Sequence, residues 1–311
     1  MSKRRRTNES SCGLRQQATL LGIWKKTSSK DEKSASSFGG KSKTRERKDN
    51  NDFLQSTSRP ANLLTKKQPR WENISQNNAP MLILRGGIGG MRKSSIRKSL
   101  AALPHWNENV TFNAYGRQCT MRRRICQYSL QGKFSYSYSG LKSVKAPAFP
   151  SNLYEIKCQV EDLLIEYILR NDYNLETMER DLSLSNEFIE LIRKSAAAMN
   201  KNDFNRIDIF NYCLLNHYRN GEEYMSYHSD DESSLCPHCP IASVSLGVTR
   251  SFDVRQKVKK GNNNKKQSRI PLGDGDLLVM FPPMQHYYEH SIPVEKRVVG
   301  ERINLTFRRI V

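Results

Sequence analysis

Short strand-like runs after Ile207, the last of which alternates polar and apolar residues from Arg302 to Arg308, are the feature that most constrains the fold. A period of two residues is typical of strands with one buried face. Links of hairpin length separate many of the runs, so consecutive strands are expected to be antiparallel. The pattern predicts a two-sheet antiparallel jelly roll. The expected strands are Ile209–Tyr218, Ala242–Gly247, Ser251–Val258, Asp276–Phe281 and Ile303–Arg308.

Two segments carry apolar residues at helical spacing instead, namely Gln159–Leu169 and Asn186–Met199. Ser185 precedes the second segment, and serine is a favoured N-cap residue. We expect both helices to cover one face of a sheet, which makes the fold class mainly β with flanking helices. The stretch Lys257–Ser268 is interpreted as a solvated loop between two strands.

The first 70 residues differ in composition from the rest of the chain. They contain 18 Lys and Arg against 6 Asp and Glu, and so hold 12 of the 20 net positive charges. Few apolar residues accompany this charge, so the segment is predicted to be disordered. Apolar residues become regular from about Asn73. We therefore expect a disordered basic arm at 1–72 and a folded domain at 73–311.

The net charge favours a polyanionic partner, because phosphates attract Lys and Arg and release counterions on binding. Nucleic acid is the first candidate and an acidic membrane surface the second. No apolar run reaches the roughly 18 residues that span a bilayer, and the N-terminus leads into no signal-peptide core. Seven scattered cysteines do not resemble a disulfide framework, so reduced thiols are expected. We expect a soluble, intracellular monomer with no membrane attachment.

A histidine and a carboxylate lie two residues apart at His228 and Asp230, so an extended backbone would turn both side chains to one face. His290 follows a run that resembles a buried strand and is the candidate third ligand. Two histidines and one carboxylate leave open coordination positions, which non-haem Fe(II) oxygenases need for a co-substrate and oxygen. The alternative is a polar turn with solvated acids.

A strand-like segment, Arg302–Arg308, begins twelve residues after His290. Its alternation places on one face Arg302, Asn304, Thr306 and Arg308. Two guanidinium groups on one face suit a dicarboxylate, because each can grip a carboxylate with two hydrogen bonds. The alternative is a basic sheet edge that faces solvent or phosphate.

Five segments, in this order and at these spacings, resemble the motif set of the AlkB-family dioxygenases, nearest its nuclear DNA-repair members. They are Asn216–Arg219, His228–Glu232, Ala242–Gly247, Glu289–Pro293 and Arg302–Arg308. The resemblance extends over about residues 110–311. It implies a double-stranded β-helix (jelly-roll) dioxygenase core that uses Fe(II), with 2-oxoglutarate and O2 as co-substrates.

The resemblance also implies roles for the matched residues. The Fe(II) ligands would be His228, Asp230 and His290. The residues that hold 2-oxoglutarate would be Asn216, Tyr218, Arg302, Thr306 and Arg308, with Arg302 on the distal carboxylate. The residues that contact the substrate base would be Tyr136, Tyr138, Asp231 and Glu232. The two tyrosines alternate onto one face, where rings could stack on an extruded base. The alternatives are two core tyrosines and an exposed loop acid at Glu232.

The implied activity is oxidative demethylation of N-alkylated bases in DNA, of the 1-methyladenine and 3-methylcytosine type. This reaction releases formaldehyde and succinate and repairs the base directly. Such lesions pair weakly, which makes base flipping easier. RNA or protein demethylation stays open, because the sequence does not report how a 2′-hydroxyl would be treated. The other alternative is a non-catalytic adaptor, against which the complete ligand set argues.

The arm contains two further signals. Lys3–Arg6 is a basic cluster of the kind that serves nuclear import or nucleic-acid affinity, and it favours a nuclear protein. Gln17–Trp24 resembles the peptide that docks on replication sliding clamps, with Leu20, Ile23 and Trp24 as a three-pronged plug. Ile23 departs from the more usual aromatic residue. The alternative is a fortuitous apolar island.

The chain departs from the AlkB pattern in its length between motifs. Ser151–Arg206 carries two helical segments where one is expected, and Lys257–Ser268 is longer and more basic than a simple hairpin. Cys236-Pro237-His238-Cys239 resembles half of a zinc knuckle. No second pair of ligands stands at a suitable spacing, so a surface loop is the preferred interpretation.

Overall fold

The computed structural model describes residues 70–74, 79–114, 117–136, 144–170, 182–200, 207–257 and 267–311. The predicted basic arm, its import cluster and its clamp-like segment lie almost entirely outside these residues. So do Tyr138 and the middle of the stretch between Lys257 and Ser268. Among the described helices, none is long and apolar enough to cross a membrane.

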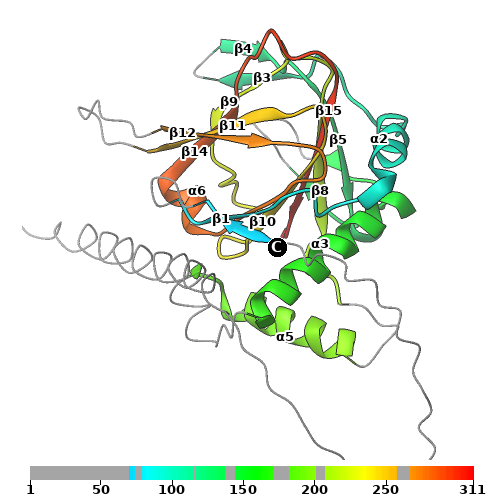
Figure 1. Cartoon of the computed structure of the whole chain (residues 1–311), viewed down its shortest axis with the longest axis vertical. Helices are drawn as coiled ribbons and strands as arrows, with labels where there is room; N and C mark the ends of the chain where they lie inside the picture. The colour runs from blue at the N-terminus through cyan, green and yellow to red at the C-terminus, as the bar shows by residue number, and fades with distance from the viewer. Residues whose placement is uncertain are drawn as a thin grey trace, which may run out of the picture.

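Two antiparallel sheets form the core (Figure 1). The larger sheet contains, in spatial order, β1 (Trp71–Asn73), β2 (Met81–Leu84), β13 (Leu277–Met280), β10 (Ile241–Gly247), β15 (Arg302–Arg308), β8 (Tyr212–Tyr218) and β5 (Arg124–Ser129). The smaller sheet contains β12 (Gln267–Leu272), β11 (Arg250–Gln256), β14 (Tyr288–Ile292) and β9 (Met225–His228). The predicted two-sheet jelly roll is confirmed, and all five predicted strands are present with slightly shifted ends.

Two short hairpins stand apart from these sheets. One pairs β3 (Thr111–Ala114) with β4 (Arg117–Thr120), and the other pairs β6 (Ser135–Tyr136) with β7 (Val144–Lys145).

The prediction of a loop over Lys257–Ser268 is wrong at its C-terminal end, because β12 begins at Gln267. Its side chains alternate between exposed and buried along the whole strand. The strand contains Pro271, which weakens a strand signal in the sequence. An edge strand tolerates proline, since one side of it needs no ladder hydrogen bonds, and β12 lies at the edge of the smaller sheet.

Helices cover the outer face of the larger sheet. Their bounds are α2 (Lys93–Ala101), α3 (Ser151–Arg170) and α5 (Asn186–Asn200). Both predicted helices are therefore confirmed, and α3 begins eight residues earlier than its apolar pattern indicates. The Ser185 hydroxyl accepts a hydrogen bond from the backbone N–H of Phe188 at 3.2 Å, which is N-cap geometry. Short helical segments are η2 (Gly90–Arg92), η3 (Leu130–Gly132) and α6 (Pro283–Tyr287).

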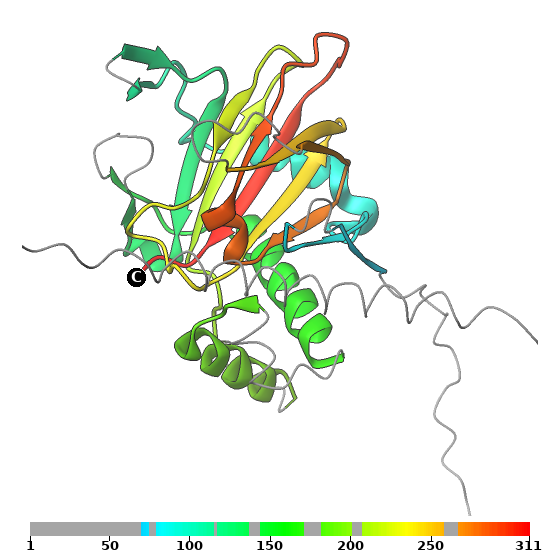
Figure 2. The ribbon, with the colours of Figure 1, turned by 90° about the vertical axis from the view of Figure 1, so that its left-hand side faces the viewer.

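Strand β15 separates an apolar layer from a polar interior. Ile303, Leu305 and Phe307 join the cluster formed with α3 and α5, on the outer face of the larger sheet. The opposite face of β15 carries the predicted polar row, which lies between the two sheets and is at most 7% exposed. Figure 2 shows the strands of the larger sheet side by side. Burying four polar side chains is unfavourable unless each has a hydrogen-bond partner. This buried polar row therefore indicates a candidate functional site.

Candidate functional site

His228, Asp230 and His290 come together between the two sheets, as the motif resemblance implies. His228 ends β9 and lies opposite His290 on the neighbouring β14, and Asp230 follows two residues later. One donor atom from each residue can be chosen such that all three lie within 4.8 Å of one another. The Asp230 carboxylate is 3.7 Å from Nε2 of His228 and 3.9 Å from Nε2 of His290. These distances leave room for one metal ion among the donors.

The protonation states also fit a metal. Burial lowers the pKa of His228, and burial together with the neighbouring His228 lowers the pKa of His290 to about 3. Burial raises the pKa of the Asp230 carboxyl, but Arg308 and the two histidines outweigh it and hold that pKa well below its usual range. Neutral imidazoles and an ionised carboxylate are the forms that coordinate metal ions.

Outer hydrogen bonds orient two of the three donors, His228 and Asp230. His228 Nδ1 lies 2.9 Å from the carbonyl of Ser226, which turns Nε2 toward Asp230. The backbone N–H of Asp230 donates to Oε1 of Gln285 at 2.9 Å. Arg308 donates to Oδ1 of Asp230 at 2.6 Å, and both side chains are almost fully buried. These contacts fix the His228 ring and the Asp230 carboxylate in position.

A second group of polar side chains continues from the triad across β15 and β8. Thr306 donates to Oδ1 of Asn304 at 3.0 Å, and Asn216 donates to the same oxygen at 3.4 Å. Asn304 in turn donates to Ser243 at 2.8 Å. All five predicted 2-oxoglutarate residues line one small cavity with the triad, namely Asn216, Tyr218, Arg302, Thr306 and Arg308.

Arg302 is incompletely paired within this group. It is 1% exposed and donates from NH2 to Ser245 at 2.9 Å, whereas Nε and NH1 have no hydrogen-bond partner among the described residues. Burial lowers the pKa of Arg302 to about 10. A buried guanidinium with two unused donors is unfavourable unless a carboxylate or phosphate completes it. The arrangement fits an anionic ligand beside the triad.

The sequence pattern does not predict several members of the network. Arg123 donates to Asn216 at 2.6 Å across 93 residues of chain, so no local signal could have identified it. Ser243 and Ser245 could have been found, because they alternate along β10 with the same period as the row on β15.

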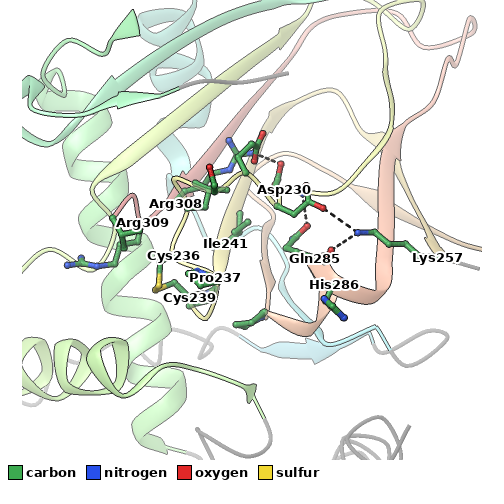
Figure 3. Close-up of a pocket in the computed structure, with 17 residues that line it drawn as sticks. Asp230, Cys236, Pro237, Cys239, Ile241, Lys257, Gln285, His286, Arg308 and Arg309 are labelled. Carbon is green, nitrogen blue, oxygen red and sulfur yellow. Dashed lines mark hydrogen bonds and ion pairs between the residues drawn. A yellow bond between two sulfur atoms is a disulfide. The ribbon is translucent and has the colours of Figure 1, made fainter. Parts of the chain in front are cut away.

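The predicted base-contacting residues are only partly described. Asp231 and Glu232 line a second cavity, of about 420 Å³, together with Lys257, His286 and Arg309 (Figure 3). This cavity shares Asp230 and Arg308 with the first. Lys257 donates to the carbonyl of Gln285 at 2.9 Å and lies 3.5 Å from Asp231. Tyr136 is placed on β6 by its backbone alone, and Tyr138 lies outside the described residues.

Cys236 and Cys239 form a disulfide at the wall of this cavity. The expectation of reduced thiols is therefore wrong for this pair. The number and scatter of the cysteines do not resemble a disulfide framework, and they do not report a turn that brings two neighbouring cysteines together.

Comparison with known proteins identifies the family. A model described as "2OG-Fe(II) oxygenase superfamily" matches residues 91–308. The DNA oxidative demethylase ALKBH2 is 43% identical over 105 residues in both Mus musculus and Homo sapiens, which is 33% of this chain and 44% or 40% of those proteins. The alpha-ketoglutarate-dependent dioxygenase alkB homolog 3 of Homo sapiens is 42% identical over 106 residues, 32% of this chain and 37% of that protein.

The matched segment thus spans less than half the length of each of these relatives. The family model, by contrast, spans more than two thirds of this chain and contains the triad, the polar row of β15 and the cavity between the sheets. Its implied cofactors are Fe(II), 2-oxoglutarate and O2, and the His-Asp-His cluster provides donors of the matching kind. The chain belongs to the 2OG-Fe(II) oxygenase superfamily.

Proposed function

We propose that the chain is an oxidative demethylase of N-alkylated bases in DNA, of the 1-methyladenine and 3-methylcytosine type, that releases formaldehyde and succinate. The observation that carries this proposal is the buried, incompletely paired Arg302 beside a His-Asp-His cluster. The relatives named as DNA oxidative demethylases, and the net charge of +20, support DNA as the substrate.

In the proposed complex His228, Asp230 and His290 hold Fe(II). The bound metal, with 2-oxoglutarate and O2, supplies the oxidation of the N-alkyl carbon. The Arg302 fork grips the distal carboxylate of 2-oxoglutarate, with the other contacts made by Asn216, Tyr218, Thr306 and Arg308. Arg308 also holds the Asp230 carboxylate in its orientation and ionised form. These contacts fix the geometry before the base arrives.

The 420 Å³ cavity is the proposed base site. Asp231 and Glu232 place carboxylates at its wall, which favours bases that carry a positive charge through alkylation. Tyr136 and Tyr138 are proposed to stack on the extruded base from the β6 region. The protein's part in catalysis is to aim the alkyl carbon at the triad and to exclude water.

The test is a demethylation assay with the full chain, Fe(II), 2-oxoglutarate and oligonucleotides that each carry one 1-methyladenine or 3-methylcytosine. Nucleoside mass spectrometry is expected to show loss of the methyl group from DNA, with succinate formed in step. Turnover of RNA alone would favour the RNA demethylase instead. Binding of DNA with no turnover of any substrate would favour the non-catalytic adaptor.

We further propose that 1–72 is a separate basic arm ahead of the catalytic domain at 73–311. Its cluster Lys3–Arg6 supports a nuclear protein, and Gln17–Trp24 supports docking on a replication sliding clamp. A monomer is proposed for the domain. These modules would bring the enzyme to DNA without taking part in the reaction.

Replacing Ile23 and Trp24 together with alanine is expected to abolish clamp binding and to leave turnover of a short oligonucleotide unchanged. Hot-spot side chains dominate short-peptide interfaces, and ordering a flexible segment leaves little surplus affinity. Calorimetry of both arms against the clamp measures the first effect, and the demethylation assay measures the second. Equal clamp affinity would reduce the motif to a coincidence, and lost turnover would place the arm in the active site.

A further inference from the structure

The Cys236–Cys239 disulfide lies in the loop that links the metal-binding segment to β10. Cys236 stands only four residues after Glu232, and both cysteines line the proposed base cavity (Figure 3). The loop thus forms one wall of that cavity. A change in the conformational freedom of this loop would therefore alter the surface that meets the substrate base.

The two sulfur atoms differ in accessibility. Cys239 is 6% exposed, whereas Cys236 is partly exposed. An external thiol therefore reaches Cys236 first, which gives thiol–disulfide exchange a defined direction. Cys213 is fully buried, and burial raises its pKa well above the usual range, so it is not a competing site.

The loop has backbone contacts that do not depend on the disulfide. The N–H of Cys236 donates to the carbonyl of Arg309 at 2.9 Å, and the N–H of Val311 donates to the carbonyl of Ser234 at 3.1 Å. The carbonyl of His238 accepts from the N–H of Ser185 at 3.0 Å. A bridge across two intervening residues closes a very short loop, so it constrains the unfolded chain little. Breaking it should loosen the cavity wall without unfolding the domain.

We propose that Cys236 and Cys239 form a reversible redox couple that tunes the affinity of the base cavity, an inference that rests on the proposed function. A thiolate of a dithiol reductant attacks Sγ of Cys236, the S–S bond breaks, and Cys239 leaves as a thiolate that takes up a proton. The second thiol of the reductant then displaces Cys236 as a thiol. The protein gains two electrons and two protons, and the reductant becomes a disulfide.

The oxidised form binds the base more tightly, because the bridge holds the wall in the shape that the cavity requires. The reduced form keeps its backbone contacts but loses the constraint between Cys236 and Cys239, so part of the wall must be ordered on binding, which weakens affinity by about three- to tenfold. Binding of 2-oxoglutarate is unaffected, since neither cysteine lines the cavity that contains Arg302.

The experiment equilibrates the full chain, loaded with Fe(II) under anaerobic conditions, in buffers that contain reduced and oxidised dithiothreitol at graded ratios. Acid quenching, thiol alkylation and peptide mass spectrometry give the fraction of bridged Cys236 at each ratio. Anisotropy of a fluorescent DNA oligonucleotide with one 3-methylcytosine gives the affinity in the same samples. We expect the fraction of bridged Cys236 and the affinity for DNA to change together, with the same midpoint ratio. Cys236→Ser is expected to show the weaker affinity at every ratio, and the matched control Cys158→Ser to follow the wild type.

Three results would overturn the redox couple. The disulfide never forms, it is reduced only when the protein unfolds, or it is reduced with no change in the affinity for DNA. Stoichiometric zinc on the reduced protein that Cys236→Ser removes would also overturn it. These readouts do not depend on turnover. A redox-dependent affinity in a protein that demethylates nothing would therefore contradict the proposed function and leave the couple standing.

Discussion

Replacing His228 with alanine is expected to abolish iron binding and demethylation while the domain stays folded. The imidazole is partly exposed and its Nδ1 pairs with the carbonyl of Ser226, so its loss leaves no charged group stranded in the interior. Losing an outer-shell partner of a metal site typically costs 10- to 100-fold. Losing a ligand should cost more than about 100-fold, which places turnover at the detection limit.

Asp230→Ala is expected to have the same effect on iron and an additional effect on stability. It leaves Arg308 as a buried guanidinium without its carboxylate, a loss on the order of 3–5 kcal/mol for a buried pair. Metal analysis, thermal unfolding and nucleoside mass spectrometry on both variants separate the two effects. The matched control is His105→Ala, which removes an exposed histidine that does not line the cavity of the triad. Wild-type iron content and turnover in His228→Ala would remove His228 from the ligand set.

The polar and apolar faces of β15 are visible in the sequence itself. They follow directly from alternation, because a strand turns successive side chains to opposite sides. Alternation alone therefore divides Arg302 to Arg308 into core residues and site residues, and the structure confirms the division. Partners distant in the chain are not visible in this way. Arg123 reaches Asn216 only because β5 pairs with β8.

There is also a physical reason why β9 and β14 are not predicted from the sequence. β9 is four residues long, and β14 follows a one-turn helix that interrupts the apolar run before it. Their pairing, which sets His228 opposite His290, is a long-range event that neither segment encodes alone. The prediction that the two histidines lie close together rests on the resemblance of their segments to the AlkB motif set. The local pattern contributes only the two-residue spacing of His228 and Asp230.

Replacing Arg302 with alanine is expected to raise the 2-oxoglutarate requirement by about one to two decades, without destabilising the ligand-free protein. A charge-assisted contact in a buried site contributes roughly 1.5–3 kcal/mol, which corresponds to that change in affinity. Arg302 has two unused donors, so in the ligand-free protein its charge is buried with little compensation. Its removal should therefore leave the melting temperature equal or higher.

Arg250 provides the matched contrast. Its guanidinium lies 5.6 Å from the Tyr218 ring, and that of Arg302 lies 5.5 Å from the same ring. Arg250 donates to Glu295 and to three backbone carbonyls, of Asn220, Glu223 and Pro293. Arg250→Ala should therefore lower the melting temperature of the ligand-free protein, because it leaves those acceptors without a donor.

The discriminating measurement is the melting temperature with and without 2-oxoglutarate, beside a co-substrate titration of turnover. A ligand that binds only the folded state raises the wild-type melting temperature, and Arg302→Ala should lose most of that rise. Arg302→Lys should recover part of it, since lysine retains the charge but not the two-pronged fork. If Arg302→Ala instead lowers the ligand-free melting temperature and keeps the wild-type response to 2-oxoglutarate, Arg302 is a structural residue like Arg250, and the distal carboxylate is held elsewhere.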